Sequence, residues 1–258
     1  MGLSVLLAAV ALATATPAQF VAAHQLPDGG FAEPGGQADP SLTAWALLGL
    51  RAVRLPVDDR YLRAHESDLA GATDLALAVL AEARPSDALV ERLEQAPTDG
   101  AVNAAAWRLL GLARANRPLP GPSVRFLLAS QARSGGWSWR RGLAPDSNDT
   151  AAVVQALRAS RVSGRPITRA ISYLRRLENA DGGFELTPGR GSDAQSTAWA
   201  IQAFVAARKP PPRAAFRYLA RLRRPDGSYR YSLRYAVTPV WVTSQVLGAL
   251  ARRAFPLR

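Results

Sequence analysis

Two acidic side chains flank an amide in residues 145–151, and these are the residues best suited to acid–base chemistry. Asp146 and Asp149 lie three residues apart, and Asn148 lies between them. A carboxyl group can donate a proton as a general acid, whereas an amide cannot. Either carboxylate can also stabilise the start of a helix, where Asp is a favoured cap and negative charge is favourable. We expect helix capping to be the main role and keep acid chemistry as the alternative.

A second group of residues has the chemistry of a ligand pocket. Amides and tryptophans recur at helical spacing along the chain. Pockets for small molecules combine aromatic area with a few polar groups that orient the ligand, so this group predicts a site for a large, partly apolar molecule. The predicted ligand-binding residues are Trp45, Arg108, Asn148, Gln155, Gln195, Trp199, Gln202, Trp241 and Gln245.

The amino-acid composition excludes several kinds of catalytic and metal site. The 258 residues include no cysteine and only two histidines. Disulfides, thiolate nucleophiles and cysteine-ligated zinc are therefore excluded, and we expect neither a metal nor a cofactor. The formal charge of +12 could attract a polyanion. The arginines are spread along the chain instead of clustered, so we expect no nucleic-acid partner.

The helices that would position these residues repeat along the chain. Thr, or once Asn, precedes a run of small and apolar residues at steps of 30, 30, 47, 47 and 46 residues. We call these positions register marks, and they are Thr43, Thr73, Asn103, Thr150, Thr197 and Thr243. A partner helix is predicted before each mark, over residues 17–25, 58–66, 86–95, 123–133, 167–179 and 212–224. Recurring helical pairs are typical of a repeat protein.

Four of the six pairs share a glycine turn that ends in an aromatic residue. Turn chemistry explains the glycines, but it does not explain the aromatic residues, which are Phe31, Trp137, Phe184 and Tyr229. An aromatic side chain at the same place in each turn predicts a pocket for it on the neighbouring repeat. The pairs that lead to Thr73 and Asn103 lack this turn, and we interpret them as trimmed copies.

Hydrophobic phase predicts how the marked helices pack. Positions four and seven after every mark are apolar, which predicts a stripe packed against the partner helices. The stripe two before, two after and five after each mark mixes amides, tryptophans and small residues. Unpaired buried amides are costly, so this stripe predicts the wall of a central cavity. We therefore predict an all-α fold, an α/α toroid (α6/α6 barrel) of six helical hairpins that forms a single domain over residues 17–258.

Two segments carry a resemblance to a known family. Phe126-Leu127, Gln131 and Gly135-Gly136-Trp137 are similar to the aromatic-Leu-x3-Gln-x3-Gly-x-Trp repeat of squalene-hopene cyclases. The chain thus resembles the terpenoid cyclase and protein prenyltransferase toroid family over essentially everything after residue 16. Residues 145–151 resemble the Asp-x-Asp-Asp-Thr-Ala signature of class II cyclases, whose middle Asp is the acid. Asn148 occupies that position here, so the resemblance implies that this acid is lost.

Three hypotheses for function follow. The first is an exported toroid that binds an isoprenoid-like or other large, partly apolar small molecule in its central cavity without catalysis. The alternative is a class II terpene cyclase, an isomerase, with Asp149 or Asp146 as the acid. Known class II cyclases use two helical domains around one cavity, so this alternative implies a second domain or subunit. The third is an interaction module that binds a polyanion or an exported partner protein.

The first residues of the chain predict export. Residues 3–13 are small and apolar, and an A-x-A-like site, Ala13-Thr14-Ala15, follows them. This pattern predicts a signal peptide over residues 1–16 and a secreted or extracytoplasmic location of bacterial type. The apolar run is shorter than the ~20 residues that a membrane-spanning helix needs.

Overall fold

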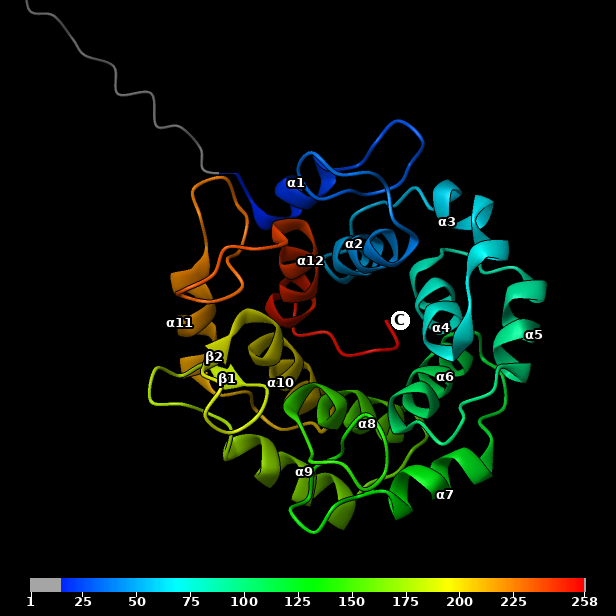
Figure 1. Ribbon diagram of the computed structural model, residues 1–258, viewed down its shortest axis with the longest axis vertical. Coiled ribbons are helices and arrows are strands. Elements are labelled where there is room, and N and C mark those ends of the chain that lie inside the picture. Colours follow the sequence, from blue (N-terminus) through cyan, green and yellow to red (C-terminus); the bar gives the residue numbers. More distant parts are fainter. Residues whose placement is uncertain (1–14, 258) are drawn as a thin grey trace, which may run out of the picture.

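Helices alternate between an inner and an outer ring along the chain (Figure 1). The computed structural model describes residues 15–257. The inner helices are α2 (Pro40–Ala52), α4 (Gly71–Ala81), α6 (Val102–Arg114), α8 (Ser147–Ala159), α10 (Ala194–Ala206) and α12 (Pro239–Leu250). The outer elements are α1 (Pro17–Ala22), α3 (Arg60–Ala64), the 3-10 helix η1 (Glu66–Asp68), α5 (Asp87–Gln95), α7 (Gly121–Ala129), α9 (Arg165–Arg175) and α11 (Arg213–Leu222). The predicted all-α toroid of six helical hairpins is confirmed.

The first residues of the chain fall mostly outside this description. The predicted signal peptide covers residues 1–16, of which only Ala15 and Thr16 are described. Thr16 caps α1, because its hydroxyl accepts a hydrogen bond from the backbone N of Gln19. Within residues 15–257, every helix is too short or too polar to cross a bilayer. Export therefore stays a prediction.

Aspartates start three of the inner helices. Asp39, Asp146 and Asp193 are the N-caps of α2, α8 and α10, and each carboxylate accepts a hydrogen bond from a backbone N in the first turn. Capping satisfies one of the N–H groups that a helix start leaves unpaired. The predicted capping role of Asp146 is confirmed, whereas Asp149 lies inside the first turn of α8. We call the face at which the six inner helices begin the mouth.

The Thr hydroxyls of four register marks hold the aromatic turns. Each hydroxyl accepts a hydrogen bond of 2.8 or 2.9 Å from the backbone N of one turn aromatic; the pairs are Thr43 with Phe31, Thr150 with Trp137, Thr197 with Phe184, and Thr243 with Tyr229. These four aromatic side chains are at most 3% exposed. Because a buried N–H needs an acceptor, the Thr is required wherever the turn occurs.

The turn aromatics are buried, and Trp137 Nε1 donates to the carbonyl of Leu127 in its own repeat at 2.7 Å, so a pocket for them on the neighbouring repeat stays a prediction. In the turn at Gly136, the ring of Tyr173 from outer helix α9 of the next repeat lies directly against the glycine. A Cβ added at Gly136 would approach this ring to 2.7 Å, so only glycine fits. The Tyr173 hydroxyl donates to the carbonyl of Pro145 at 2.6 Å. These contacts fix the loop that leads into α8.

Loops at the mouth bind four of the inner helices to a neighbouring repeat and close the ring. The backbone N of Val102 at the start of α6 donates to the carbonyl of Trp139, and Ala194 at the start of α10 donates to Tyr231. Between them, the short hairpin of β1 (Phe184–Glu185) and β2 (Ser192–Asp193) leads into α10. The last link joins the two ends of the ring, because the Glu33 carboxylate accepts from the backbone N atoms of Val240 and Trp241 at the start of α12.

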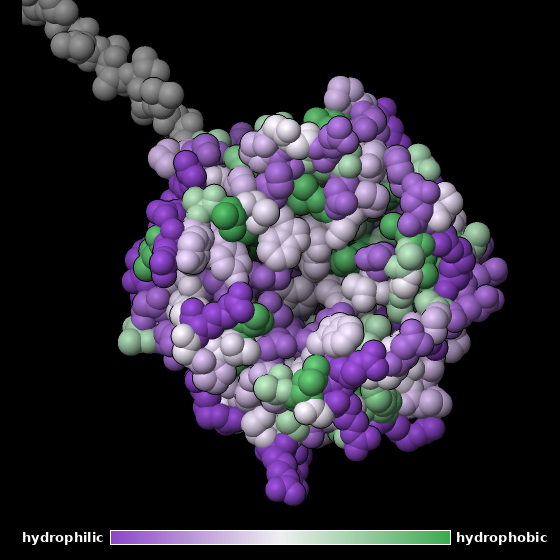
Figure 2. Space-filling model, viewed as in Figure 1, coloured by the Kyte–Doolittle hydropathy of each residue, from purple (hydrophilic) through white to green (hydrophobic). Residues whose placement is uncertain are grey.

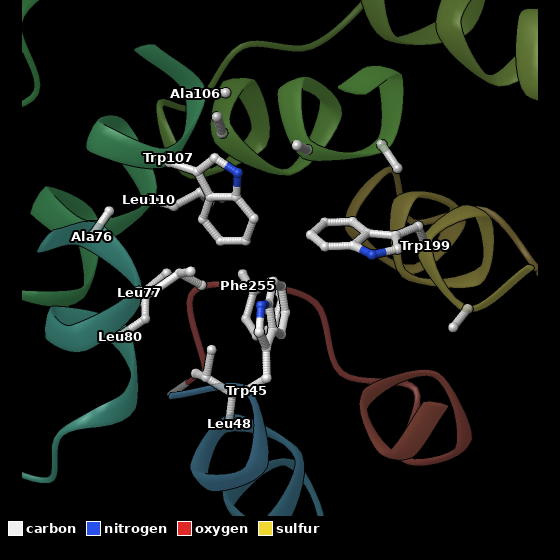
Figure 3. Close-up of a cluster of buried hydrophobic side chains, with 14 of the residues drawn as sticks. Trp45, Leu48, Ala76, Leu77, Leu80, Ala106, Trp107, Leu110, Trp199 and Phe255 are labelled. Carbon is white, nitrogen blue, oxygen red and sulfur yellow. The ribbon is translucent and has the colours of Figure 1, made fainter. Parts of the chain in front are cut away.

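The predicted helix register is wrong by two residues in α4 and α6. Trp107 and Leu77 were assigned to the outward stripe, but both point toward the ring centre (Figure 3). Arg108 was assigned to the inner stripe, yet its Nη1 donates to the carbonyl of Ala96, which follows outer helix α5. Thr73 and Asn103 have no aromatic turn to hold, so they are not equivalent to the other four marks. Thr73 and Asn103 were aligned with the other four marks only because they have a similar residue type and are followed by similar residues.

Candidate functional site

Aromatic side chains fill the centre of the ring. Trp45, Trp107 and Trp199 come from three inner helices and meet edge to face, with ring centroids 5.6–5.7 Å apart (Figure 3). Phe255 from the C-terminal segment packs on all three at 6.1–6.3 Å. Edge-to-face geometry is the favourable arrangement for such pairs. The tryptophans predicted to hold a ligand therefore pack on one another and on the chain's own phenylalanine.

The central glutamines are also bonded within the chain. Gln155 Oε1 accepts from the backbone N of Phe255 at 2.7 Å, and Gln202 Nε2 donates to the carbonyl of Arg253 at 3.0 Å. Gln245 Oε1 accepts from Trp199 Nε1 at 2.8 Å. The space that remains beside them is about 10 Å³, which is no more than one water molecule occupies.

The prediction of an open central cavity is therefore wrong, although the four full-length repeats do turn the predicted stripe inward. Polar groups in that stripe needed partners, and backbone atoms of residues 253–255 supply two of them. In Figure 1 the C-terminal segment enters the middle of the ring. A ligand of isoprenoid size has no room there.

The remaining predicted site residues lie at the mouth. Asn148, Gln195 and Trp241 are half-buried, one helical turn above the tryptophan layer. Once the register of α4 and α6 is shifted by two residues, Thr73 and Asn103 lie in the same layer of the mouth as these three residues. Sequence reasoning missed both residues, although a shift of their helices by two positions would have placed them in the mixed stripe.

Asp146 and Asp149 form a carboxyl pair at the mouth, and Asn103 from α6 holds it. The two side chains hydrogen-bond to each other, and the backbone N of Asp149 donates to Asp146 Oδ1 at 2.8 Å. Asn103 Nδ2 donates to Asp149 Oδ1 at 2.6 Å. Asp149 is only 7% exposed, so its orientation is fixed by these partners.

The surroundings of the pair keep one proton on it. Burial, the charge of Asp149 and the hydrogen bond between the two side chains together raise the pKa of Asp146 to about 8. Burial also raises the pKa of Asp149, but hydrogen bonds from Asp146 and Asn103 favour its ionised form. Hydrogen bonds to a charged carboxylate stabilise that form. The pKa values of both carboxyls are thus raised, and a state of the pair that retains one proton is favoured near neutral pH.

Two hollows lie beside each other at the mouth, on either side of α2. The first, of about 470 Å³, is lined mainly by apolar atoms and includes Leu42 and Trp241, with Glu33 and Asp39 at its edge. The second, of about 180 Å³, lies between α2 and α4 and includes Asp74 and Leu77. Viewed down the ring axis, the molecule is hollowed at its centre (Figure 2). Space for an apolar ligand is therefore found at the mouth.

Comparison with known proteins identifies similar chains. No family model matches this sequence. The chain is 32% identical over 234 residues to a drimenyl diphosphate synthase from Streptantibioticus cattleyicolor, covering 84% of this chain and 41% of the relative. It is 29% identical to a drimenyl diphosphate synthase from Streptomyces showdoensis, covering 89% and 44%. The chain thus spans less than half the length of these curated relatives.

A solved structure supports the same fold. The ent-copalyl diphosphate synthase from Streptomyces platensis superposes with a TM-score of 0.57 at 19% identity, over 83% of this chain and 50% of that one. The named relatives are enzymes, so they overturn the expectation that this ring only binds its ligand without catalysis. The two sequence relatives and the shared ring architecture agree with the repeat and turn residues. The chain belongs to the terpenoid cyclase and prenyltransferase toroid family.

Proposed function

We propose that this chain is the acid-bearing toroid of a class II terpene cyclase that isomerises a linear isoprenoid diphosphate. The carboxyl pair of Asp146 and Asp149, with Asp149 buried and held by Asn103, carries this proposal, because it lies in the segment that resembles the acid signature of class II cyclases. The names of the sequence relatives support a substrate with a diphosphate group. Asn148 is not the donor, since an amide has no acidic proton to give.

The reaction is a proton-initiated rearrangement with no net change in atoms. Asp146 transfers its proton to one carbon of a terminal double bond, and positive charge develops on the other carbon. An internal double bond attacks that carbon and forms a ring. Loss of a proton from a carbon next to the final cation then restores a double bond and the original formula.

Each member of the acid site has a separate task in this scheme. Asp146 donates the proton, and the Asp149 carboxylate places negative charge beside the developing cation, which fixed charges stabilise in a site that excludes water. Asn103 positions Asp149 through its 2.6 Å hydrogen bond. Trp241 lines the apolar hollow at the mouth, and aromatic rings can stabilise cations through their faces.

The reacting chain must be covered from outside the ring. The centre of the toroid is filled, so the substrate lies above the mouth, where Asp39 and Asp74 are exposed to solvent. A carbocation in contact with water is quenched, and enclosure prevents such side reactions. Class II cyclases use two helical domains around one cavity, and this chain spans 41% and 44% of its relatives. A second toroid is therefore expected to cover the mouth.

The test is turnover of linear C15 and C20 isoprenoid diphosphates by the full chain. Products are dephosphorylated and identified by gas chromatography and mass spectrometry as cyclic isomers of the substrate. Asp146→Asn should lower kcat by roughly 10²–10⁴-fold, the usual contribution of a general acid. Asp193→Asn is the matched control, because Asp193 caps α10 in the way that Asp146 caps α8 and Asn preserves a cap.

The pH dependence gives an independent check. Since the pKa of Asp146 is raised to about 8, turnover should be constant below that pH and should fall above it as the donor loses its proton. Equal losses in Asp146→Asn and Asp193→Asn would show that the pair is not the acid, and absence of any cyclised product from the wild type would refute the proposed function.

A further inference from the structure

Charge is divided between two halves of the mouth. Six loops lead into the inner helices. The first three, residues 31–39, 65–70 and 95–101, contain five acidic residues and no Lys or Arg, and we call them the acidic half. The last three, residues 137–146, 184–193 and 229–238, contain five arginines and form the basic half. The three acidic residues of the basic half, Asp146, Glu185 and Asp193, are buried or half-buried.

Exposed apolar side chains at the mouth are also distributed unevenly between the acidic half and the basic half. Five large hydrophobic side chains are about half exposed in the basic half: Trp139, Leu143, Leu233, Tyr235 and Val237. Exposed arginines, among them Arg141 and Arg234, lie next to them in sequence. The acidic half instead contributes to the apolar hollow of about 470 Å³, whose edge carries Glu33 and Asp39. The basic half therefore carries exposed apolar side chains beside arginines, and the acidic half carries carboxylates beside the apolar hollow. Another hollow, of about 410 Å³, lies in the basic half and includes Arg190 and Leu233.

We propose that the mouth of one chain docks on the mouth of a second copy of the same chain. A two-fold axis in the plane of the mouth, along the boundary between the halves, brings each basic half onto the acidic half of the partner. Such an interface is isologous, so both contacts form at once. Rotated arrangements would place like charges opposite each other, which is unfavourable. Charge therefore selects one orientation.

This inference rests on the proposed function and names the second toroid that it requires. The two Asp146–Asp149 pairs would face one enclosed space between the rings. Apolar loops of one copy would fill the hollow of the other and remove water from around the substrate.

Complementary charge reversals test the interface. Sedimentation velocity should give twice the mass of the chain for the wild type. The double variant Arg141→Glu with Arg234→Glu reverses two charges of the basic half, and Asp68→Arg with Asp74→Arg reverses two charges at and beside the acidic half, since Asp74 lies in the first turn of α4. Each double variant alone should dimerise more weakly than the wild type, because the reversed side chains meet charges of their own sign. An equal mixture of the two should recover the dimer, because the reversed side chains of one copy then meet those of the other with opposite charge.

A control pair separates local from global charge. Arg84→Glu with Arg213→Glu causes the same change in net charge, and both residues are exposed at the opposite face, so this variant should remain dimeric. A monomeric wild type, dimers that survive either mouth reversal, or a mixture that stays monomeric would overturn the inference. Turnover by a monomer would refute the dimer and leave the function standing. A dimer that shows the predicted charge dependence but no turnover would refute the function and leave the interface standing.

Discussion

Replacement of Thr150 by Val tests the contact that organises four of the six repeats. The Thr150 hydroxyl accepts from the backbone N of Trp137 at 2.9 Å and donates to its carbonyl at 3.2 Å. Thr150 is fully buried, as is Trp137. Valine has nearly the same shape, so no cavity forms, but the Trp137 N–H loses its only protein acceptor. The Trp137 carbonyl keeps its hydrogen bond from the backbone N of Asp146 at 3.0 Å.

The expected cost is that of one unpaired buried donor, about 1–3 kcal/mol. Urea denaturation followed by circular dichroism measures it as a lower midpoint at an unchanged slope, since the surface exposed on unfolding does not change. The loop that contains Asp146 starts from the same turn, so the variant should also lose turnover more than a stability loss of this size accounts for.

Thr73→Val provides the matched comparison. Thr73 occupies a register mark without an aromatic turn, it is half-buried, and its hydroxyl makes only a long 3.5 Å contact with Asn103. Its loss should change stability by no more than about 0.5 kcal/mol. If the two substitutions cost the same, or if Thr150→Val costs nothing, the Thr–turn hydrogen bond does not hold the repeat together and our reasoning is wrong.

Two further predictions concern the interior. Phe255→Ala should destabilise the ring by about 3–5 kcal/mol in urea denaturation, because Phe255 packs on three tryptophans. Leu250→Ala, at an exposed helix end, should cost much less. Equal costs would mean that residues 253–257 do not close the centre. Burial, then the charges of Glu66 and Asp59, raise the pKa of Glu82 to about 8, so its contribution to stability is present below pH 4.5 and is lost as the pH rises to 8. Glu82→Gln should therefore raise the melting temperature at pH 8.5 more than at pH 4.5, and an equal change at both would contradict the buried, unpaired carboxyl.

Local chemistry made much of the fold predictable. Glycine turns, proline and aspartate at helix starts, and apolar periodicity depend on residues close together in sequence. They led to six helical hairpins, to the alternation of outer and inner helices, and to buried turn aromatics. The acid site was predictable in part for the same reason. Asp146 and Asp149 share one helix start, but Asn103, which holds Asp149, lies 46 residues away.

Tertiary structure decided what the inner stripe contacts. The sequence showed that Gln155 and Gln202 would need polar partners, and a bound ligand and a segment of backbone satisfy that need equally well. Only the packed ring shows that residues 253–255 supply the partners, 100 residues from Gln155 along the chain. The register of α4 and α6 could not be predicted from the sequence for a related reason. A Thr or Asn at a helix start looks the same in sequence whether or not a turn hydrogen-bonds to it, and that bond forms only when the repeats pack together.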